Sequence, residues 1–281
     1  MPVLLKTLIN TNELVKLLGQ SNVVVLDCRF YLTDLSKGRS EYDKGHIPGA
    51  IFVDVHCELS GIESELTGRH PLPAEADFSK QLQRWGIDSS SKVVVYDDMG
   101  GAIAARAWWM LSQQNIDVQV LNGGYPDWLK EGGAVSLTPE KAKTSTVQIE
   151  VSFPWGITEQ AIVENFETNQ LQLVDARAVD RFNGENETID PVAGHIPGAI
   201  NRPFNDNLDS EGRFKPAEQL HVEWQDWLSG DGDDYVYYCG SGITACHNVL
   251  ALNYAGIEAK QVYVGSWSQW AKRMLRVSAE Q

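Results

Sequence analysis

The sequence predicts an α/β protein with two tandem domains, each a mainly parallel sheet flanked by helices on both faces. Its 281 residues are enough for two domains of about 100–200 residues each. Short apolar segments alternate with helical patterns, which is typical of parallel sheets covered on both faces. The chain also repeats itself, so its two halves should fold alike.

The repeat is visible in two long segments of each half. VVLDCRF…YDKGHIPGAIFVDV at residues 24–55 returns as LVDARAVDRF…VAGHIPGAINRPF at residues 173–204, with an identical GHIPGA. Residues 93–128 align without a gap onto residues 235–270. A duplication of one domain explains both matches.

The domain limits follow from the repeat and from a change in composition. The stretch SLTPEKAKTSTVQ after residue 135 is polar, rich in Thr and Lys, and has no helical periodicity. Such a stretch between two patterned regions is typical of a connecting segment. We therefore expect domains at residues 1–138 and 154–281, joined by a linker at residues 139–153.

Six strands are expected where β-branched and aromatic residues cluster between turn signals. Each half should contribute three of them in the same order. The expected strands cover residues 23–27, 93–97, 118–121, 173–175, 235–239 and 261–264.

Six helices are expected from apolar residues spaced three and four positions apart. Asn10 and Thr11 ahead of Glu13, and Thr158 ahead of Glu159, are typical helix starts. The expected helices cover residues 10–18, 77–85, 102–112, 158–168, 216–228 and 244–254.

The composition excludes several classes of protein and partner. The sequence has no run of about 18 apolar residues, and its N-terminal apolar stretch is too short for a signal peptide, so a soluble, cytoplasmic protein is expected. The four cysteines have no CxxC spacing, which argues against a disulfide framework and a metal site. A formal net charge of -15 makes nucleic acid or an anionic membrane an improbable partner.

Cys239 is the residue that points to chemistry. In the repeat alignment it falls on Asp97 of the first half, each directly after a strand that ends in tyrosine. Ligands of α/β sheets bind beyond the carboxyl ends of the strands, where Cys239 should lie. Cys28, Cys57 and Cys246 lack such a setting and are expected to be buried structural cysteines.

The residues after Cys239 suit a loop that holds an anion. Backbone N–H groups of small, turn-compatible residues can point inward at the sulfur, and the following helix adds its positive end. Both effects favour the thiolate, so Cys239 is expected to be a nucleophile at neutral pH. The loop residues are Gly240, Ser241, Gly242, Ile243 and Thr244.

Two other uses of a reactive cysteine fit the sequence less well. A cysteine phosphatase closes its loop with an arginine six residues after the cysteine, and here that position is Ala245. A cysteine protease needs a histidine base near the thiol. His247 lies on the following helix and is expected on that helix's surface.

The chain resembles the two-domain rhodanese family over nearly its whole length. The resemblance rests on CGSGITA, the twin GHIPGA, Asp97 in place of the first-half cysteine, and the closing VGSWSQW. It implies two tandem rhodanese-like domains, of which the first is catalytically silent. Within the family, a basic loop resembles thiosulfate sulfurtransferases, whereas the neutral Cys-Gly-Ser-Gly loop found here resembles 3-mercaptopyruvate sulfurtransferases.

The resemblance implies a persulfide mechanism without metal or organic cofactor. Cys239 attacks the sulfur of 3-mercaptopyruvate, a small anionic donor, and pyruvate leaves as its enolate. A small thiol, a thioredoxin-like protein or cyanide then removes the outer sulfur. Two alternatives stay open: thiosulfate as the donor, and a sulfur-carrier or regulatory module whose acceptor is another protein.

The resemblance also assigns supporting residues. Arg181 matches the family arginine that binds the donor's anionic group, but the second arginine usual before the second GHIPGA is absent from a stretch that holds Asp190. His46 resembles the family histidine that joins a loop serine, here Ser241, in proton transfer.

Arg29 and Arg177 each follow a strand within an Asp-x-Arg triplet. Because the triplet occurs at equivalent positions in both halves, we expect these arginines to form structural ion pairs.

Overall fold

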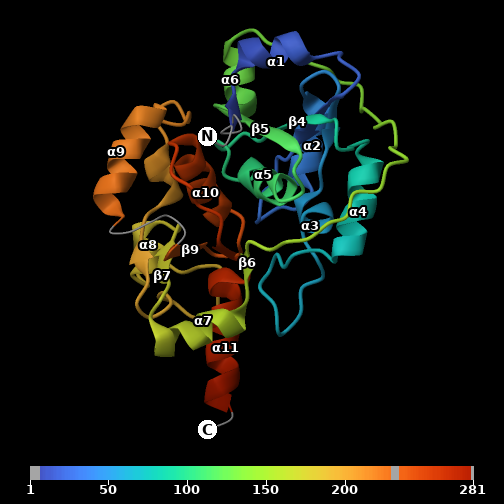
Figure 1. The fold of residues 1–281 in the computed structure, drawn as a ribbon. Helices are drawn as coiled ribbons and strands as arrows, with labels where there is room; N and C mark the ends of the chain where they lie inside the picture. Colours follow the sequence, from blue (N-terminus) through green and yellow to red (C-terminus); the bar gives the residue numbers. More distant parts are fainter. Residues whose placement is uncertain (1–6, 229–233, 280–281) are drawn as a thin grey trace. The chain divides into compact units, whose positions relative to one another are not determined.

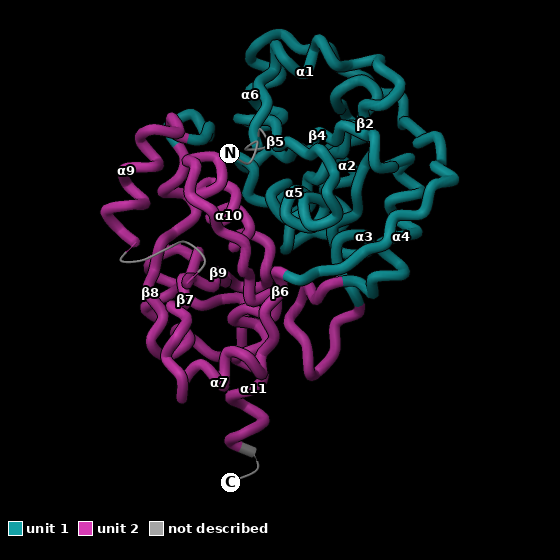
Figure 2. Tube along the Cα trace, in the orientation of Figure 1, with its two compact units in different colours: residues 1–61, 73–154, 209–214 teal, residues 62–72, 155–208, 215–281 magenta. Residues whose placement is uncertain are grey.

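The computed structural model describes residues 7–228 and 234–279, which fall into two compact units (Figures 1 and 2). Both units are α/β with a parallel sheet, which confirms the predicted fold class. Unit 1 comprises residues 1–61, 73–154 and 209–214, and unit 2 comprises residues 62–72, 155–208 and 215–281.

Unit 1 contains a five-stranded parallel sheet in the order β1-β5-β4-β2-β3. Val25 of β2 lies between Ala50 and Val94 on the neighbouring strands, so the middle of the sheet is apolar. Helix α5 packs on β4 and β5. The strands are β1 (Leu8–Ile9), β2 (Val23–Asp27), β3 (Ala50–Phe52), β4 (Lys92–Tyr96) and β5 (Asp117–Leu121). The helices are α1 (Thr11–Leu17), α2 (Lys37–Lys44), α3 (Val55–Glu58), α4 (Glu75–Arg84), α5 (Ala104–Ser112) and α6 (Gly124–Lys130).

Unit 2 repeats this topology with the strand order β6-β10-β9-β7-β8. Helix α10 packs on the central strand β9, and Ile162, Val236 and Trp267 belong to the core. The strands are β6 (Gly156–Ile157), β7 (Gln172–Asp175), β8 (Ile200–Asn201), β9 (Tyr235–Tyr238) and β10 (Val262–Tyr263). The helices are α7 (Glu159–Thr168), α8 (Val179–Phe182), the 3-10 turn η1 (Phe204–Asn207), α9 (Ala217–Trp227), α10 (Ala245–Tyr254) and α11 (Ser266–Ala279).

All six predicted strands and all six predicted helices form, with ends that differ by at most two residues. Strand β2 matches its predicted limits at both ends. Asn10 caps α1 by accepting the N–H of Glu13, while the Glu13 carboxylate accepts the N–H of Asn10. This reciprocal cap confirms the predicted helix start.

The predicted structural ion pairs are also confirmed. Arg29 donates to Asp27 at 2.6 Å and to the carbonyl of Gly45 at 2.8 Å. Arg177 repeats the arrangement with Asp175 at 2.7 Å and Gly194 at 2.7 Å. Since Gly45 and Gly194 begin the two GHIPGA motifs, each buried pair ties that turn to the end of its strand.

Candidate active site

Cys239 lies at the carboxyl end of β9, before the loop that leads into α10. Its side chain is nearly buried, with the residue 2% exposed. The N–H of Gly242 lies 3.2 Å from Sγ, in position to donate to it. The N–H of Cys239 itself donates to Ser266 Oγ at 3.1 Å, so the residue is held from both sides.

The loop after Cys239 is anchored on the start of α11. The carbonyl oxygens of Cys239 and Gly240 accept the N–H groups of Trp267 at 3.0 Å and Ser268 at 2.9 Å. Gly242 has a φ of +77°, and a Cβ on it would lie 2.3 Å from the carbonyl oxygen of Val264. A side chain at Gly242 would therefore both strain and displace the loop.

Asp97 in unit 1 shows what the corresponding loop does with an anion. Its buried carboxylate accepts four backbone N–H groups at 2.7–2.9 Å. These donors follow Asp97 within seven residues, as the loop and the first turn of α10 follow Cys239. The donors are those of Met99, Gly101, Ile103 and Ala104.

Ser241 is hydrogen-bonded to a histidine that the sequence analysis did not select. Its Oγ lies 2.9 Å from Nδ1 of His70, and both residues are buried. His70 belongs to residues 62–72, a segment between the repeated motifs that the contacts place in unit 2. The sequence signal was the string GRHPLP at residues 68–73, because its counterpart in the second half, GRFKP at residues 212–216, has Phe214 in place of the histidine.

His46, which was expected to join Ser241, has backbone partners instead. Its two ring nitrogens lie 2.9 Å from the carbonyl oxygen of Tyr42 and 3.1 Å from that of Thr138, and its ring stacks on Tyr42. His195 in the second GHIPGA has the same setting on Phe182. Ser241 is therefore paired with His70, whereas the histidine of each GHIPGA closes its own turn.

Two arginines lie beside the loop that follows Cys239. A Cβ on Gly240 would lie 3.1 Å from Nη2 of Arg69 and 3.7 Å from Nη1 of Arg181, so the glycine leaves room for both guanidinium groups. Arg181 was expected at the donor site; Arg69 was not. The Arg69 and Arg181 side chains are 17% and 21% exposed, so both remain open to small solutes.

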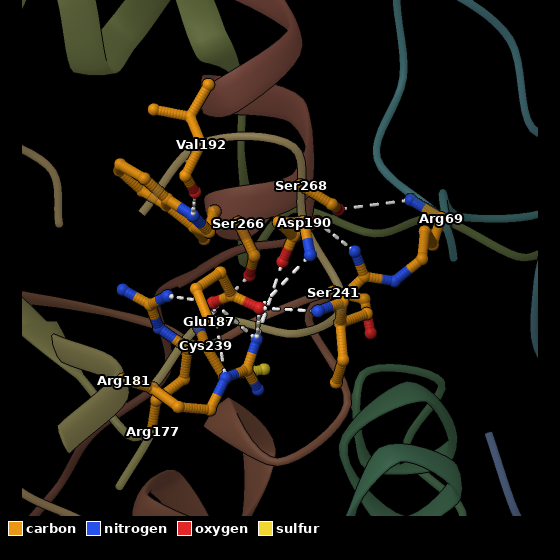
Figure 3. A network of polar contacts seen from close by, with 12 residues as sticks. Arg69, Arg177, Arg181, Glu187, Asp190, Val192, Cys239, Ser241, Ser266 and Ser268 are labelled. Atoms are coloured by element: carbon orange, nitrogen blue, oxygen red, sulfur yellow. Dashed lines mark hydrogen bonds and ion pairs between the residues drawn. The ribbon is translucent and has the colours of Figure 1, made fainter. Parts of the chain in front are cut away.

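Both arginines are paired with buried carboxylates (Figure 3). Arg69 contacts Asp190, and Arg181 lies 2.8 Å from Glu187 and 3.5 Å from Asp190. Glu187 also contacts Arg177 at 3.2 Å and accepts the N–H groups of Ile189 and Asp190. The stretch that lacks the expected second arginine thus supplies acidic partners for two arginines.

The two carboxylates differ in their electrostatic setting. Burial would raise the pKa of Glu187, but N–H donors from Asp190 and Ile189 and the Arg181 guanidinium outweigh it and hold that pKa below its usual range. Burial raises the pKa of Asp190 above its ordinary value, although Arg69 and Arg181 oppose the shift. The pKa values of the two carboxyl groups are therefore shifted in opposite directions.

Two minor expectations about single residues were wrong. His247 is fully buried in α10, with Nδ1 3.3 Å from Asn207 Nδ2, rather than on the helix surface. Cys57 is exposed on α3 rather than buried, whereas Cys28 and Cys246 are buried as expected.

No candidate for a bound metal or a membrane span occurs among residues 7–228 and 234–279. No group of three or more His, Cys, Asp or Glu side chains in these ranges could hold a metal ion. No helix there is long and apolar enough to cross a bilayer.

Comparison with known proteins decides the family. The rhodanese-like domain matches twice, at residues 10–131 and at residues 158–273. The chain belongs to the rhodanese family. This rhodanese is 44% identical to a probable 3-mercaptopyruvate sulfurtransferase of Pseudomonas aeruginosa over 94% of both chains. It is also 36% identical to the thiosulfate sulfurtransferase of Mus musculus, over 89% of this chain and 85% of the mouse protein.

Solved structures give the same picture of this rhodanese. It is similar to 3-mercaptopyruvate sulfurtransferase from Leishmania major, with a TM-score of 0.84 and 29% identity, over 96% of this chain and 75% of the other. It is also similar to the 3-mercaptopyruvate sulfurtransferase of Escherichia coli, with a TM-score of 0.80 and 27% identity, over 93% and 98% of the two chains. The names of all four proteins indicate sulfur transfer; three name 3-mercaptopyruvate and one names thiosulfate.

Proposed function

We propose that this protein is a 3-mercaptopyruvate sulfurtransferase that carries the transferred sulfur as a persulfide on Cys239. The observation that carries the proposal is a nearly buried cysteine on a neutral Cys-Gly-Ser-Gly loop, with the Gly242 N–H 3.2 Å from its sulfur. An N–H donor beside the sulfur and the start of a helix after the loop suit a covalent nucleophile that carries a charged intermediate.

In the first half-reaction the Cys239 thiolate attacks the sulfur of 3-mercaptopyruvate. A new S–S bond forms, the carbon–sulfur bond of the donor breaks, and its electron pair remains on pyruvate as the enolate. Protonation of the enolate gives pyruvate. The outer sulfur stays on Cys239 as a persulfide, so no external oxidant or reductant is needed.

The Ser241–His70 pair supplies the proton in this proposal. Ser241 is two residues after the nucleophile, and its hydroxyl lies 2.9 Å from the imidazole of His70. A hydroxyl backed by an imidazole can protonate a developing enolate and take up the proton of the incoming thiol. His70 therefore takes the part that the family resemblance assigned to His46.

In this proposal the loop stabilises the persulfide by donating N–H hydrogen bonds to its charged outer sulfur. Asp97 supports this role, because the corresponding loop of unit 1 holds a buried carboxylate with four N–H donors. Gly240, Ser241, Gly242, Ile243 and Thr244 would present N–H groups to the outer sulfur in the same way. The domain at residues 1–138 would itself be silent, because Asp97 cannot carry sulfur.

In the second half-reaction a thiolate attacks the outer sulfur and the Cys239 thiolate leaves. The acceptor is a small thiol or a thioredoxin-like protein, or cyanide in an assay. All four cysteines of the chain are free, which supports action in a reducing, cytoplasmic compartment.

Thiosulfate is the second candidate donor. Two guanidinium groups beside the loop, those of Arg69 and Arg181, are a fitting set of donors for a dianion. The neutral loop argues the other way, since it adds no positive side chain next to the sulfur.

The donor experiment measures pyruvate release from 3-mercaptopyruvate and thiocyanate formation from thiosulfate, both with cyanide as acceptor. We expect a higher kcat/KM with 3-mercaptopyruvate. A higher value with thiosulfate would reassign the donor. Slow turnover with every small acceptor, together with fast sulfur transfer to a thioredoxin-like protein, would instead indicate a sulfur carrier.

A further inference from the structure

We propose that Asp190 is a specificity-determining residue: its carboxylate competes with the sulfur donor for Arg69 and Arg181 and weakens the binding of dianionic donors most. The inference rests on the proposed function, because it concerns the donor site of that reaction. Asp190 lies in the stretch before the second GHIPGA, where the family resemblance led us to expect a second arginine.

The two arginines are the groups that a donor anion would meet beside the nucleophile. Both guanidinium groups lie against Gly240, the residue after Cys239. Both side chains keep part of their surface open. An anion held there would lie next to the sulfur that attacks it.

The Asp190 carboxylate already contacts both of these guanidinium groups (Figure 3). Its side chain is 2% exposed, contacts Arg69 and lies 3.5 Å from Arg181. The backbone N–H of Asp190 donates to the Glu187 carboxylate at 3.0 Å, and this hydrogen bond holds the main chain of Asp190 in place. Asp190 is thus a built-in anion at the donor site.

The local charges sum to zero with Asp190 and to +1 without it. The cluster holds three guanidinium groups and three carboxylates, joined by ion pairs. Its members are Arg69, Arg177 and Arg181 on one side and Asp175, Glu187 and Asp190 on the other. A donor anion therefore enters a neutral site and must share guanidinium N–H groups that Asp190 holds.

Glu187 and Asp175 have a different task from Asp190. Asp175 pairs with Arg177 within the turn of the second GHIPGA, and Glu187 binds Arg177, Arg181 and two backbone N–H groups. Within the described part of the chain, the ion pair of Arg69 is made with Asp190 rather than with either of these carboxylates, and Asp190 contacts both arginines beside Gly240. Asp190 is therefore the carboxylate with which a donor anion would compete at both arginines, whereas it would meet Glu187 at Arg181.

The test is the steady-state kinetics of Asp190→Asn with both donors. Asparagine keeps the shape and an oxygen acceptor for Arg69 but removes the charge. We expect KM to fall about tenfold for the thiosulfate dianion and about threefold for the 3-mercaptopyruvate monoanion, because the attraction scales with donor charge. Asp190→Glu should keep the wild-type KM values.

Glu185→Gln is the matched control. Glu185 is exposed in the same segment, five residues before Asp190, and its side chain accepts from Asn183. The substitution removes one negative charge near the site without freeing a guanidinium group. Its KM values should equal those of the wild type.

The outcomes separate this inference from the proposed function. If Asp190 only anchors Arg69, Asp190→Asn will lower kcat while KM stays equal or rises, and the inference is wrong. An equal fall of KM in Glu185→Gln would assign the effect to overall charge and would also overturn it. Absence of turnover by the wild type with either donor would refute the proposed function itself.

Discussion

Cys239→Ser is expected to lower pyruvate release from 3-mercaptopyruvate by at least about 10³-fold, as for other covalent nucleophiles. A serine hydroxyl is not ionised at neutral pH and cannot form a persulfide. The side chain is nearly buried and close to isosteric, so the fold should be retained. The measurement is kcat/KM for pyruvate formation with cyanide as acceptor.

Cys57→Ser is the matched control for this substitution. Cys57 is the exposed cysteine of α3, so it is the thiol most open to adventitious sulfur chemistry. Cys57→Ser should keep the wild-type kcat/KM. Loss of activity in Cys57→Ser, together with activity retained in Cys239→Ser, would show that the nucleophile is Cys57 of unit 1 and would contradict the proposed mechanism.

His70→Asn is expected to lower kcat about 10²-fold, the effect typical of losing a general acid or base. The imidazole lies 2.9 Å from Ser241 Oγ, so its removal leaves the serine without its proton partner. KM should change little, because His70 is assigned a role in proton transfer rather than in holding the donor anion. The kcat and KM of the variant are measured separately to check this.

Ser241→Ala and the double variant give the control for His70. If the two side chains work as one unit, the double variant will lose no more kcat than the more damaged single variant. Fully additive losses would show that His70 and Ser241 act independently. An unchanged kcat in His70→Asn would exclude His70 from the proton path.

The regular parts of the fold could be predicted because their patterns are long enough. Strand β2 has five residues and α7 has ten, and both formed close to their predicted limits. Strands β1, β6 and β8 have two residues each, and β3 has three, too few to show an alternating pattern. Their pairing depends on the neighbouring strands rather than on local sequence.

Helix α11 was within reach of the sequence and was overlooked. Trp267, Trp270, Ala271 and Met274 follow the spacing of a helix with one apolar face. Reading VGSWSQW as a closing motif concealed that periodicity. The helix matters for function, since its first residues anchor the carbonyls of Cys239 and Gly240.

The sequence predicted the candidate nucleophile Cys239 but did not select His70, the histidine beside Ser241. Comparing the two repeats selected Cys239, because the equivalent position in the first half holds Asp97, a residue with different chemistry. The family resemblance suggested His46, but a histidine present in both copies serves the turn they share. His70 comes from residues 62–72, whose place in unit 2 is a long-range contact that no local pattern reveals.

The central claim is that Cys239 carries the transferred sulfur, and mass spectrometry of the donor-treated protein tests it most directly. The protein is incubated with 3-mercaptopyruvate, freed of donor without reductant, alkylated and digested. We predict that the peptide containing Cys239 gains the mass of one sulfur atom and loses it on treatment with cyanide. A peptide that gains no sulfur, in a protein that still turns the donor over, would contradict the account.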